Sequence, residues 1–593
     1  MSDGGRGSAM PADAAGEVAA HVVAAFDRFN AEFLAISGRA AGRFAAHDWA
    51  GARRDAAERL DLYDAVLARG SAELKAALGP RAVEKATWIA AKRRYASLIA
   101  GRFDLERAET FFNSITRKLL ATVGIDRDVE FFYPRPRGAT LADPMIVCRS
   151  YESGGSTPRL VRSALEDLAL GCVYEDIDRD AQRVGDEIDL SLWPLSGGRG
   201  SWRLDVVKAP FYRNKGAYVV GRIVLGERIV PLVLPLVHGE RGIAVDAVLM
   251  REAQAAILFS FAYSYFHVAL ERHDALIALL RSIMPRQPWA ALYTSLGHNR
   301  HGKTEFYRSL HRFVHDSRQR FLVAPGLEGA VMIVFTLPSY DFVFKVIKDR
   351  PCFLRSHAET RKTIARDEVR RRYEFVSHRD RAGRMVDTQE FENLKFRTWR
   401  FSEQLLREFA LAARESVAIT DDYVTIRHVY VQRRVTPLPL YLQAEKDPET
   451  VRRVLLDFGF FLKDVAASGV FPCDLFNTWN YGVTLWGRVV LYDYDDVAPL
   501  ERVTFREKPA PRHALEELKP EEDWIVAGDE DFFLDELERY SGVPQPLRGI
   551  FRAAHGDLYT LEFWRGLKER LARGEIPDVF PYDRGVRFAA RLG

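Results

Sequence analysis

The spacing of apolar positions divides the chain into stretches of different character. From about residue 14 to 120, apolar residues recur every three or four positions with few glycines or prolines, which predicts several amphipathic helices. Between about 131 and 249 the apolar runs are shorter. Two of them flank Gly226-Glu227 and predict a β-hairpin over residues 217–237. Helices are expected again from about 251 to 318.

One apolar run within that helical stretch approaches the length of a membrane span. Residues 253–270 read AQAAILFSFAYSYFHVAL and include Gln254, two serines, two tyrosines and His267. Such polar side chains are rare in a helix that faces lipid, so a buried core helix is expected instead. The first residues lack a basic segment followed by a compact apolar one, so no export signal is predicted.

The second half of the chain begins with strands and continues mainly with helices. This order predicts a small β-rich lobe followed by a helical lobe. The expected elements are strands at 329–337 and 340–348, helices at 359–373 and about 388–412, a strand at 424–433, a long helix at 448–467, a strand at 488–492 and a helical tail.

Composition narrows the class of protein. The 593 residues exceed one compact core, so at least two domains are expected. The 85 basic and 82 acidic side chains leave a net charge of +3, which does not favour a nucleic-acid partner. The four cysteines form no CxxC pair, so neither a cysteine zinc site nor a disulfide framework is predicted, and a cytoplasmic location is expected.

Gly297-His-Asn-Arg-His-Gly302-Lys303-Thr304 matches the phosphate-loop pattern GxxxxGK[ST]. A functional loop of this kind needs a buried strand in front of it, whereas residues 289–296 have helical character. The favoured interpretation is therefore a solvated loop that caps a helix over 305–313. A P-loop ATPase that uses Lys303 stays as an alternative.

Asp493-Tyr-Asp495-Asp496-Val497 resembles the DxDx[TV] motif of haloacid-dehalogenase-type phosphatases, in which the first aspartate is the nucleophile. Only 96 residues follow Val497. That length is too short for the parallel sheet that these enzymes build after the motif, so this interpretation is disfavoured.

A third set of residues indicates a protein-kinase-like site. A turn that contains Gly326 and Gly329 lets backbone amides approach phosphates, and a lysine on the next strand can pair with them. Alternation along 340–348 places Lys345 on one face with Val343 and Ile347. The sequence therefore predicts that Lys345 faces a nucleotide cleft.

The kinase interpretation gains support from residues later in the chain. Asp474 and Asn480 follow Gly469 in the frame of a kinase catalytic loop, and Asp493 lies at the position of the DFG aspartate. Kinase chemistry uses an aspartate to accept the hydroxyl proton, and an asparagine and a second aspartate to hold metal ions. The spacing of six between Asp474 and Asn480, rather than five, departs from the usual pattern. A literal His378-Arg379-Asp380 lacks the asparagine and is interpreted as the end of a charged helix.

Several longer strings are similar to the bacterial isocitrate dehydrogenase kinase/phosphatase family. They include APGLEGAVMIVFTLPSYDFVFKVIKD, GRMVDTQEFEN, HVYVQRRVTPLPLYL and RVVLYDYDDV in the second half, and FYRNKGAYVVGRI, FSFAYSYF and GHNRHGKTEFYR in the first. The resemblance covers nearly the whole chain. It implies an α+β protein with a mainly helical regulatory domain containing a small β-sheet at 1–318 and a protein-kinase-like bilobal domain at 319–593, divided near 432/433.

The resemblance also implies the activity and the site. The family phosphorylates a serine of isocitrate dehydrogenase with Mg-ATP, removes the same phosphate, and so controls the glyoxylate bypass against the citric acid cycle. Asp474 and Lys345 map onto catalytic positions, Asn480 and Asp493 onto metal positions for Mg²⁺ or Mn²⁺, and Asp387 onto the aspartate tied to phosphatase activity. The nucleotide segment that binds ATP or ADP maps onto Ala324, Pro325, Gly326, Leu327, Glu328, Gly329 and Ala330.

Further expectations follow from the same resemblance. AMP is expected as an allosteric effector of the regulatory domain, isocitrate dehydrogenase is the expected partner, a homodimer stays open, and no membrane partner is expected.

Asp387 is placed at the start of a predicted helix, and Glu390 or Glu392 on that helix is a candidate partner for Lys345. A kinase-like module that binds nucleotide without chemistry is the third alternative.

Overall fold

The computed structural model describes residues 13–133, 142–196, 201–260, 264–326, 329–353, 362–475, 477–508, 530–534, 537 and 543–589. Contacts divide the chain into two compact units. Unit 1 consists of residues 1–245 and 266–316, and unit 2 consists of residues 246–265 and 317–593. Among the described residues, no helix combines the length and the apolar character needed to cross a bilayer.

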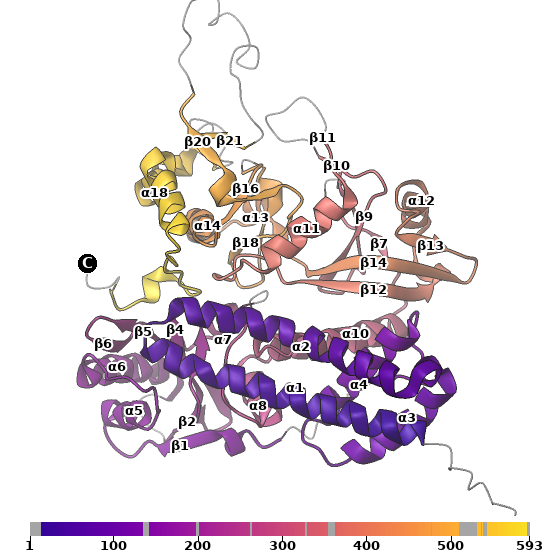
Figure 1. Ribbon diagram of the computed structural model, residues 1–593. Coiled ribbons are helices and arrows are strands. Elements are labelled where there is room, and N and C mark those ends of the chain that lie inside the picture. Colours follow the sequence, from indigo (N-terminus) through magenta and orange to yellow (C-terminus); the bar gives the residue numbers. More distant parts are fainter. Residues whose placement is uncertain are drawn as a thin grey trace, which may run out of the picture. The chain divides into compact units, whose positions relative to one another are not determined.

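Unit 1 begins with the helices that apolar periodicity predicts: α1 (Ala14–Ala45), α2 (Trp49–Leu78), α3 (Lys85–Ile99) and α4 (Leu105–Leu120). The first two run side by side in Figure 1, and each begins at an aspartate whose carboxylate accepts from a backbone N–H, Asp13 from Gly16 and Asp48 from Gly51. The apolar faces of the four helices enclose a core. It includes Trp88 of α3 and Phe111 and Phe112 of α4, all with no exposed area.

A six-stranded sheet follows in unit 1, larger than the expected hairpin. The hairpin itself is confirmed: β4 (Gly216–Leu225) pairs antiparallel with β5 (Arg228–Gly239), with Leu225 opposite Arg228, and Gly226 at φ 60° makes the turn. The remaining strands and the helices beside them are β1 (Cys148–Glu152), β2 (Arg203–Val207), β3 (Phe211–Arg213), β6 (Gly242–Val245), α5 (Thr157–Glu166) and α6 (Ile177–Ser196).

The expected helix over 253–270 is wrong for most of its length. Helix α7 covers only Glu252–Leu258. Farther along, His267 forms a backbone bridge with Tyr212, and the Phe266 N–H donates to the Ser295 carbonyl over 2.8 Å. Tyr265 and Phe266 are therefore buried on a non-helical backbone. Unit 1 ends with α8 (His273–Ile283), α9 (Trp289–Ser295) and α10 (Asn299–Asp316).

Unit 2 contains a second six-stranded sheet, with the order β12-β14-β9-β8-β7 and with β13 paired to β14. The strands are β7 (Leu322–Val323), β8 (Met332–Thr336), β9 (Phe342–Ile347), β12 (Thr388–Arg397), β13 (Val417–Ile419) and β14 (Tyr423–Arg433). The strands expected at 329–337, 340–348 and 424–433 are confirmed. One face packs Phe335 and Phe344 against Phe321, which fixes the register of β9.

The helix expected at about 388–412 is half wrong, because its first part is strand β12 and only α12 (Glu403–Ala412) is helical. Asn393 has φ 55° and interrupts the strand alternation. Phe391 and Leu394, three positions apart, are consequently both buried, and this spacing imitates a helix in the sequence.

The rest of unit 2 is mainly helical. Helix α14 covers Pro448–Ala467, as predicted, and starts at Asp447, which accepts from the Thr450 N–H. The other elements are β10 (Cys352–Phe353), β11 (Lys362–Thr363), α11 (Arg366–Ser377), β15 (Thr436–Pro437), α13 (Leu438–Ala444), β16 (Val470–Pro472), β17 (Tyr481–Val483), β18 (Val489–Leu491), β19 (Val497–Pro499), β20 (Thr504–Arg506), β21 (Asp531–Phe533), α17 (Arg548–His555) and α18 (Leu561–Ala572).

Candidate active site

Lys345 lies in the middle of the unit 2 sheet and is 4% exposed. It stands opposite Val334 on one side and Tyr430 on the other. Its ammonium donates to the Tyr492 carbonyl over 2.8 Å and lies 5.3 Å from the centre of the Tyr492 ring. A buried cation is costly unless it is hydrogen-bonded, so this contact fixes the side chain beside the segment that carries Asp493.

The expected glutamate partner of Lys345 is not on a helix. Glu390 and Glu392 both belong to strand β12. The Glu390 carboxylate contacts the His428 imidazole of β14, and Glu392 is exposed. The prediction of a helix that presents one of them to Lys345 is therefore wrong.

The glycine-containing turn connects β7 to β8, and β9, which carries Lys345, is the strand after β8. The Ala324 N–H donates to the Val334 carbonyl over 2.8 Å and closes the base of the turn. Gly326 has φ 131°, and a Cβ at Gly329 would collide with the Met332 carbonyl. Pro325 and Ala330 are exposed, Leu327 and Glu328 lie outside the described residues, and the predicted role of the whole segment stays a prediction.

Backbone hydrogen bonds bring the two predicted metal ligands together. The Asn480 carbonyl accepts from the N–H groups of Tyr492 and Asp493, over 3.1 and 3.4 Å. Asp474 lies just after β16 and is 4% exposed. The Asn477 N–H donates to the Asp474 carbonyl, and a 3-10 turn over Thr478–Asn480 follows.

Asp387 is also held beside this segment. Met385 forms a parallel bridge with Leu491, and the Val386 N–H donates to the Leu491 carbonyl over 3.0 Å. Because the two segments run in the same direction, Asp387 and Tyr492 leave the pairing at the same end. The predicted helix start is wrong here, since Asp387 precedes strand β12.

The environment of Asp387 changes its acidity. Burial raises the pKa of the Asp387 carboxyl to about 6, although the Gln389 amide at 3.4 Å and the positive charge of Arg433 act in the opposite direction. A carboxyl with this pKa can exchange a proton near neutral pH, as a general base must.

The kinase interpretation of the sequence gave no role to Asp495, two residues after Asp493. Burial and the negative charge of Asp493 raise the pKa of Asp495 well above its usual range, while Lys345 opposes the shift. Its Oδ1 is buried without a hydrogen-bond partner. The available signal was the Asp-Tyr-Asp spacing, which matches the disfavoured DxDx[TV] motif and replaces the usual DFG of a kinase.

Arg372 of α11 holds this segment from another side. Its guanidinium donates to the Asp495 carbonyl and lies 3.4 Å from an Asp496 carboxylate oxygen. Beside it, Tyr373 stacks on Tyr430 and packs against Tyr494, whose hydroxyl donates to the Val386 carbonyl. Helix α11 is thus connected to both the Asp493 segment and the Asp387 segment.

The phosphate-loop interpretation is contradicted by the backbone. Residues 289–295 are helix α9, as their character indicated, and α10 begins at Asn299, so Gly302-Lys303-Thr304 lie inside a helix and not in the expected capping loop. A Cβ at Gly302 would lie 2.7 Å from the Ala290 carbonyl oxygen. Gly302 therefore permits α9 and α10 to approach closely, and no strand feeds a phosphate cradle.

The haloacid-dehalogenase interpretation is contradicted too. Strand β18 pairs antiparallel with β17 in a three-stranded sheet, whereas that chemistry is built on a parallel sheet. The His378-Arg379-Asp380 triplet follows the last turn of α11, as predicted, and the Asp380 carboxylate accepts from the backbone of Ala382, Gly383 and Arg384.

Two protein-family models match nearly the whole chain. Residues 19–318 match the family described as isocitrate dehydrogenase kinase/phosphatase (AceK), regulatory domain, and residues 319–584 match the AceK kinase domain. The chain belongs to this family. The matched stretches include every predicted site residue.

Curated relatives extend over nearly the whole chain. A protein named isocitrate dehydrogenase kinase/phosphatase from Anaeromyxobacter sp. (strain Fw109-5) is 42% identical over 574 residues, covering 97% of this chain and 98% of the relative. Relatives of the same name from Anaeromyxobacter dehalogenans and Paracidovorax citrulli are 41% and 36% identical, and each pair is covered to at least 94%.

Proposed function

We propose that this protein phosphorylates a serine of isocitrate dehydrogenase with Mg-ATP and removes the same phosphate in the same cleft, switching the substrate enzyme off and on. The observation that carries the proposal is the convergence on one segment, residues 491–495, of Lys345, Asn480 and the backbone segment that carries Asp387. In the proposed pathway, this switch sets the flow between the glyoxylate bypass and the citric acid cycle.

The domain roles belong to the same proposal. Residues 1–318 would form the regulatory domain, which responds to AMP, and residues 319–593 a kinase-like domain with lobes on either side of residues 432/433. A sheet with the order β12-β14-β9-β8-β7, followed by the helical part with α14, supports a bilobal kinase-like architecture.

In the kinase direction, each residue has a distinct task. Residues 324–330 would contact the phosphates through backbone N–H groups, and Lys345 would pair with the α- and β-phosphates. Asp474 would accept the proton of the serine hydroxyl as the oxygen attacks the γ-phosphate. Arrangement of these groups before reaction, rather than covalent chemistry, would supply most of the acceleration.

The residues present fit a divalent cation. A carboxylate from Asp493 and an amide oxygen from Asn480 are hard oxygen donors of the kind that Mg²⁺ or Mn²⁺ takes, and Asp495 adds a buried oxygen without a partner. The bound ion would neutralise the charge on the phosphates. Asn480 and Asp493 would hold it in both directions of the reaction.

In the phosphatase direction, Asp387 would orient and deprotonate a water molecule that takes the place of the serine hydroxyl. Its pKa of about 6 suits that task, because the carboxylate is ionised at neutral pH and still basic enough to accept a proton. The cysteines offer no CxxxxxR pattern for a thiol route.

The test is transfer of labelled γ-phosphate from Mg-ATP to purified isocitrate dehydrogenase, followed by release of the label when ADP and AMP are added. Transfer to serine and subsequent release by the wild-type chain are expected. A chain that binds ATP but neither transfers nor releases phosphate would instead be the non-catalytic nucleotide-binding module.

A further inference from the structure

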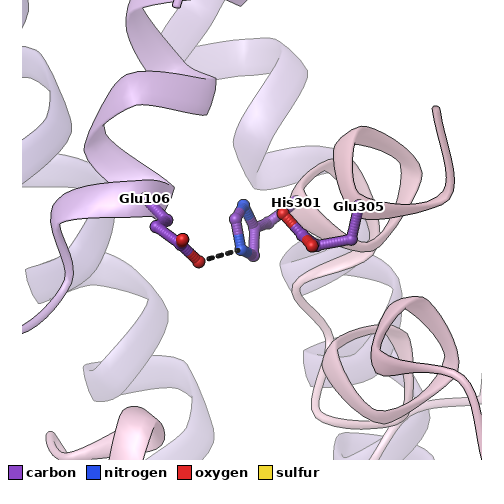
Figure 2. Close-up of side chains that lie close together, drawn as sticks. All are labelled: Glu106, His301 and Glu305. Atoms are coloured by element: carbon purple, nitrogen blue, oxygen red, sulfur yellow. Dashed lines mark ion pairs between the residues drawn. The ribbon is translucent and has the colours of Figure 1, made fainter. Parts of the chain in front are cut away.

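A cluster of potential metal ligands lies within unit 1, outside the residues used above. Glu106 comes from α4, and His301 and Glu305 lie one turn apart on the same face of α10. One ligand atom from each residue lies within 4.8 Å of the other two. In Figure 2 the imidazole of His301 lies between the two carboxylates.

The hydrogen bonds around His301 determine which ring nitrogen is available. The Thr110 hydroxyl donates to the Glu106 carbonyl over 3.0 Å and lies 2.9 Å from Nδ1 of His301. The hydroxyl therefore accepts the Nδ1 proton, and Nε2 carries a lone pair. His301 is only 3% exposed, and its Nε2 has no hydrogen-bond partner and lies 4.0 Å from a Glu106 carboxylate oxygen.

An unsatisfied nitrogen in a buried position is costly unless something binds it. A neutral imidazole that donates through one nitrogen and presents the other is the form in which histidine ligates metals.

Arg308 contacts the carboxylates of Glu305 and Glu109. Nη1 of Arg308 donates to one oxygen of Glu305 over 2.7 Å, and Nη2 lies 3.6 Å from Glu109. Arg308 is 2% exposed and its charge opposes cation binding, but the three carboxylates of Glu106, Glu109 and Glu305 outnumber it. Thr110 and Arg308 therefore hold the candidate ligands His301 and Glu305 in place through hydrogen bonds, as residues behind metal ligands commonly do.

We propose that Glu106, His301 and Glu305 bind a divalent transition-metal ion of the Zn²⁺ type, with water completing the coordination. One imidazole and two carboxylates suit this class, in which bonds of about 2.0–2.2 Å require the ligand atoms to move closer together than they now lie. The ion would cross-link α4 to α10. The segment that imitates a phosphate loop would thus hold a metal instead.

The test is equilibrium dialysis of the full chain, freed of metal and without nucleotide, against Zn²⁺. One tight equivalent per chain is expected, with affinity lowered at least about 10-fold in His301→Gln and Glu106→Gln. Thr110→Val, which removes the partner of Nδ1 but keeps all three ligands, should weaken binding about 10–100-fold. His315→Gln, an exposed histidine on the same helix, is the matched control and should bind as the wild type does.

A background of Asp493→Asn removes the proposed catalytic metal site and so separates the two ions. Anomalous diffraction at the zinc edge from wild-type crystals requires no variant to fold, and should place a peak between Glu106 and His301. No saturable equivalent, binding that is unchanged in His301→Gln, or a zinc peak elsewhere would each overturn the proposal.

Discussion

Two segments of this chain invite a nucleotide-binding interpretation in opposite ways. Gly297–Thr304 satisfies every letter of the phosphate-loop pattern but lies largely within α10, packed against α9. The kinase-like segment departs from its pattern at several positions, yet its residues converge around 491–495. A phosphate-binding loop needs a strand, a turn and backbone amides that point at the phosphate. A match to the sequence pattern alone therefore does not show that a segment binds nucleotide.

Among the carboxylate variants, the largest effect is expected at Asp493. In Asp493→Asn, loss of one carboxylate at the proposed metal site should lower the kcat/KM of phosphate transfer roughly 10²–10³-fold, as removal of one preorganised electrostatic group does elsewhere. Phosphatase activity should fall with it, because both reactions are proposed to use one cleft. Steady-state assays over a range of Mg²⁺ concentrations measure this, with Glu501→Gln, an exposed carboxylate nearby in the sequence, as the control. Unchanged phosphatase activity would refute the shared cleft.

The next largest effect separates the two directions at Asp387. Asp387→Asn should lower phosphatase activity roughly 100-fold, because an amide cannot accept a proton, and should largely spare the kinase. Since the pKa of Asp387 is raised to about 6, wild-type phosphatase activity should fall as the pH drops through 6, when the carboxylate becomes protonated. The measurement is the rate of phosphate release from phosphorylated isocitrate dehydrogenase between about pH 5 and 8, a range that includes the raised pKa.

The control for this prediction is Glu392→Gln, which changes an exposed residue of β12, the strand that follows Asp387, and should leave both activities intact. An Asp387→Asn variant with full phosphatase activity would remove Asp387 from the reaction.

A smaller effect is expected at Arg372, which tests whether α11 positions the Asp493 segment. Arg372→Gln removes the donor to the Asp495 carbonyl and the pairing with Asp496. Looser positioning of the metal ligands should lower kcat of the kinase about 10-fold, with little change in folding. Arg370→Gln removes an exposed arginine of the same helix and should have no effect. Equal losses in both variants would contradict a specific role for Arg372.

The smallest effect on catalysis is expected in the segment that imitates the phosphate loop. Gly302→Ala places a Cβ 2.7 Å from the Ala290 carbonyl oxygen and should destabilise unit 1 by about 1–3 kcal/mol. Kinase activity per folded molecule should stay the same. Gly38→Ala, at an exposed helix position with open space around it, should instead stabilise by about 1 kcal/mol. Denaturant unfolding measures both, and a Gly302→Ala variant as stable as the wild type would contradict close helix packing.

Periodicity alone predicted the long regular elements, because burial on one face dictates the spacing of their apolar residues. This holds for α1 to α4, for α14 and for the β4–β5 hairpin. It failed at β12, where Asn393 at φ 55° disrupts the alternation, and in residues 253–270, where Tyr265 and Phe266 are buried on a non-helical backbone. Both failures come from tertiary contacts that a local window does not contain.

For the candidate site, sequence order and residue type identified Lys345, Asp474, Asn480 and Asp493 as a set. The partner of Lys345 could not be predicted, since it is the main-chain carbonyl of Tyr492, which has no residue-type signal. Asp387 came from family resemblance, and its proximity to Tyr492 depends on the pairing of Met385 with Leu491, far away in the sequence. The Glu106 cluster likewise joins two helices that no spacing rule connects.

The most direct test of the central claim compares Lys345→Met with Lys303→Met in the transfer of labelled γ-phosphate from Mg-ATP to isocitrate dehydrogenase. If the cleft around residues 491–495 is the active site, Lys345→Met abolishes both transfer and later release, and Lys303→Met retains them. Loss with Lys303→Met and retention with Lys345→Met would move the chemistry to α10 and contradict the account.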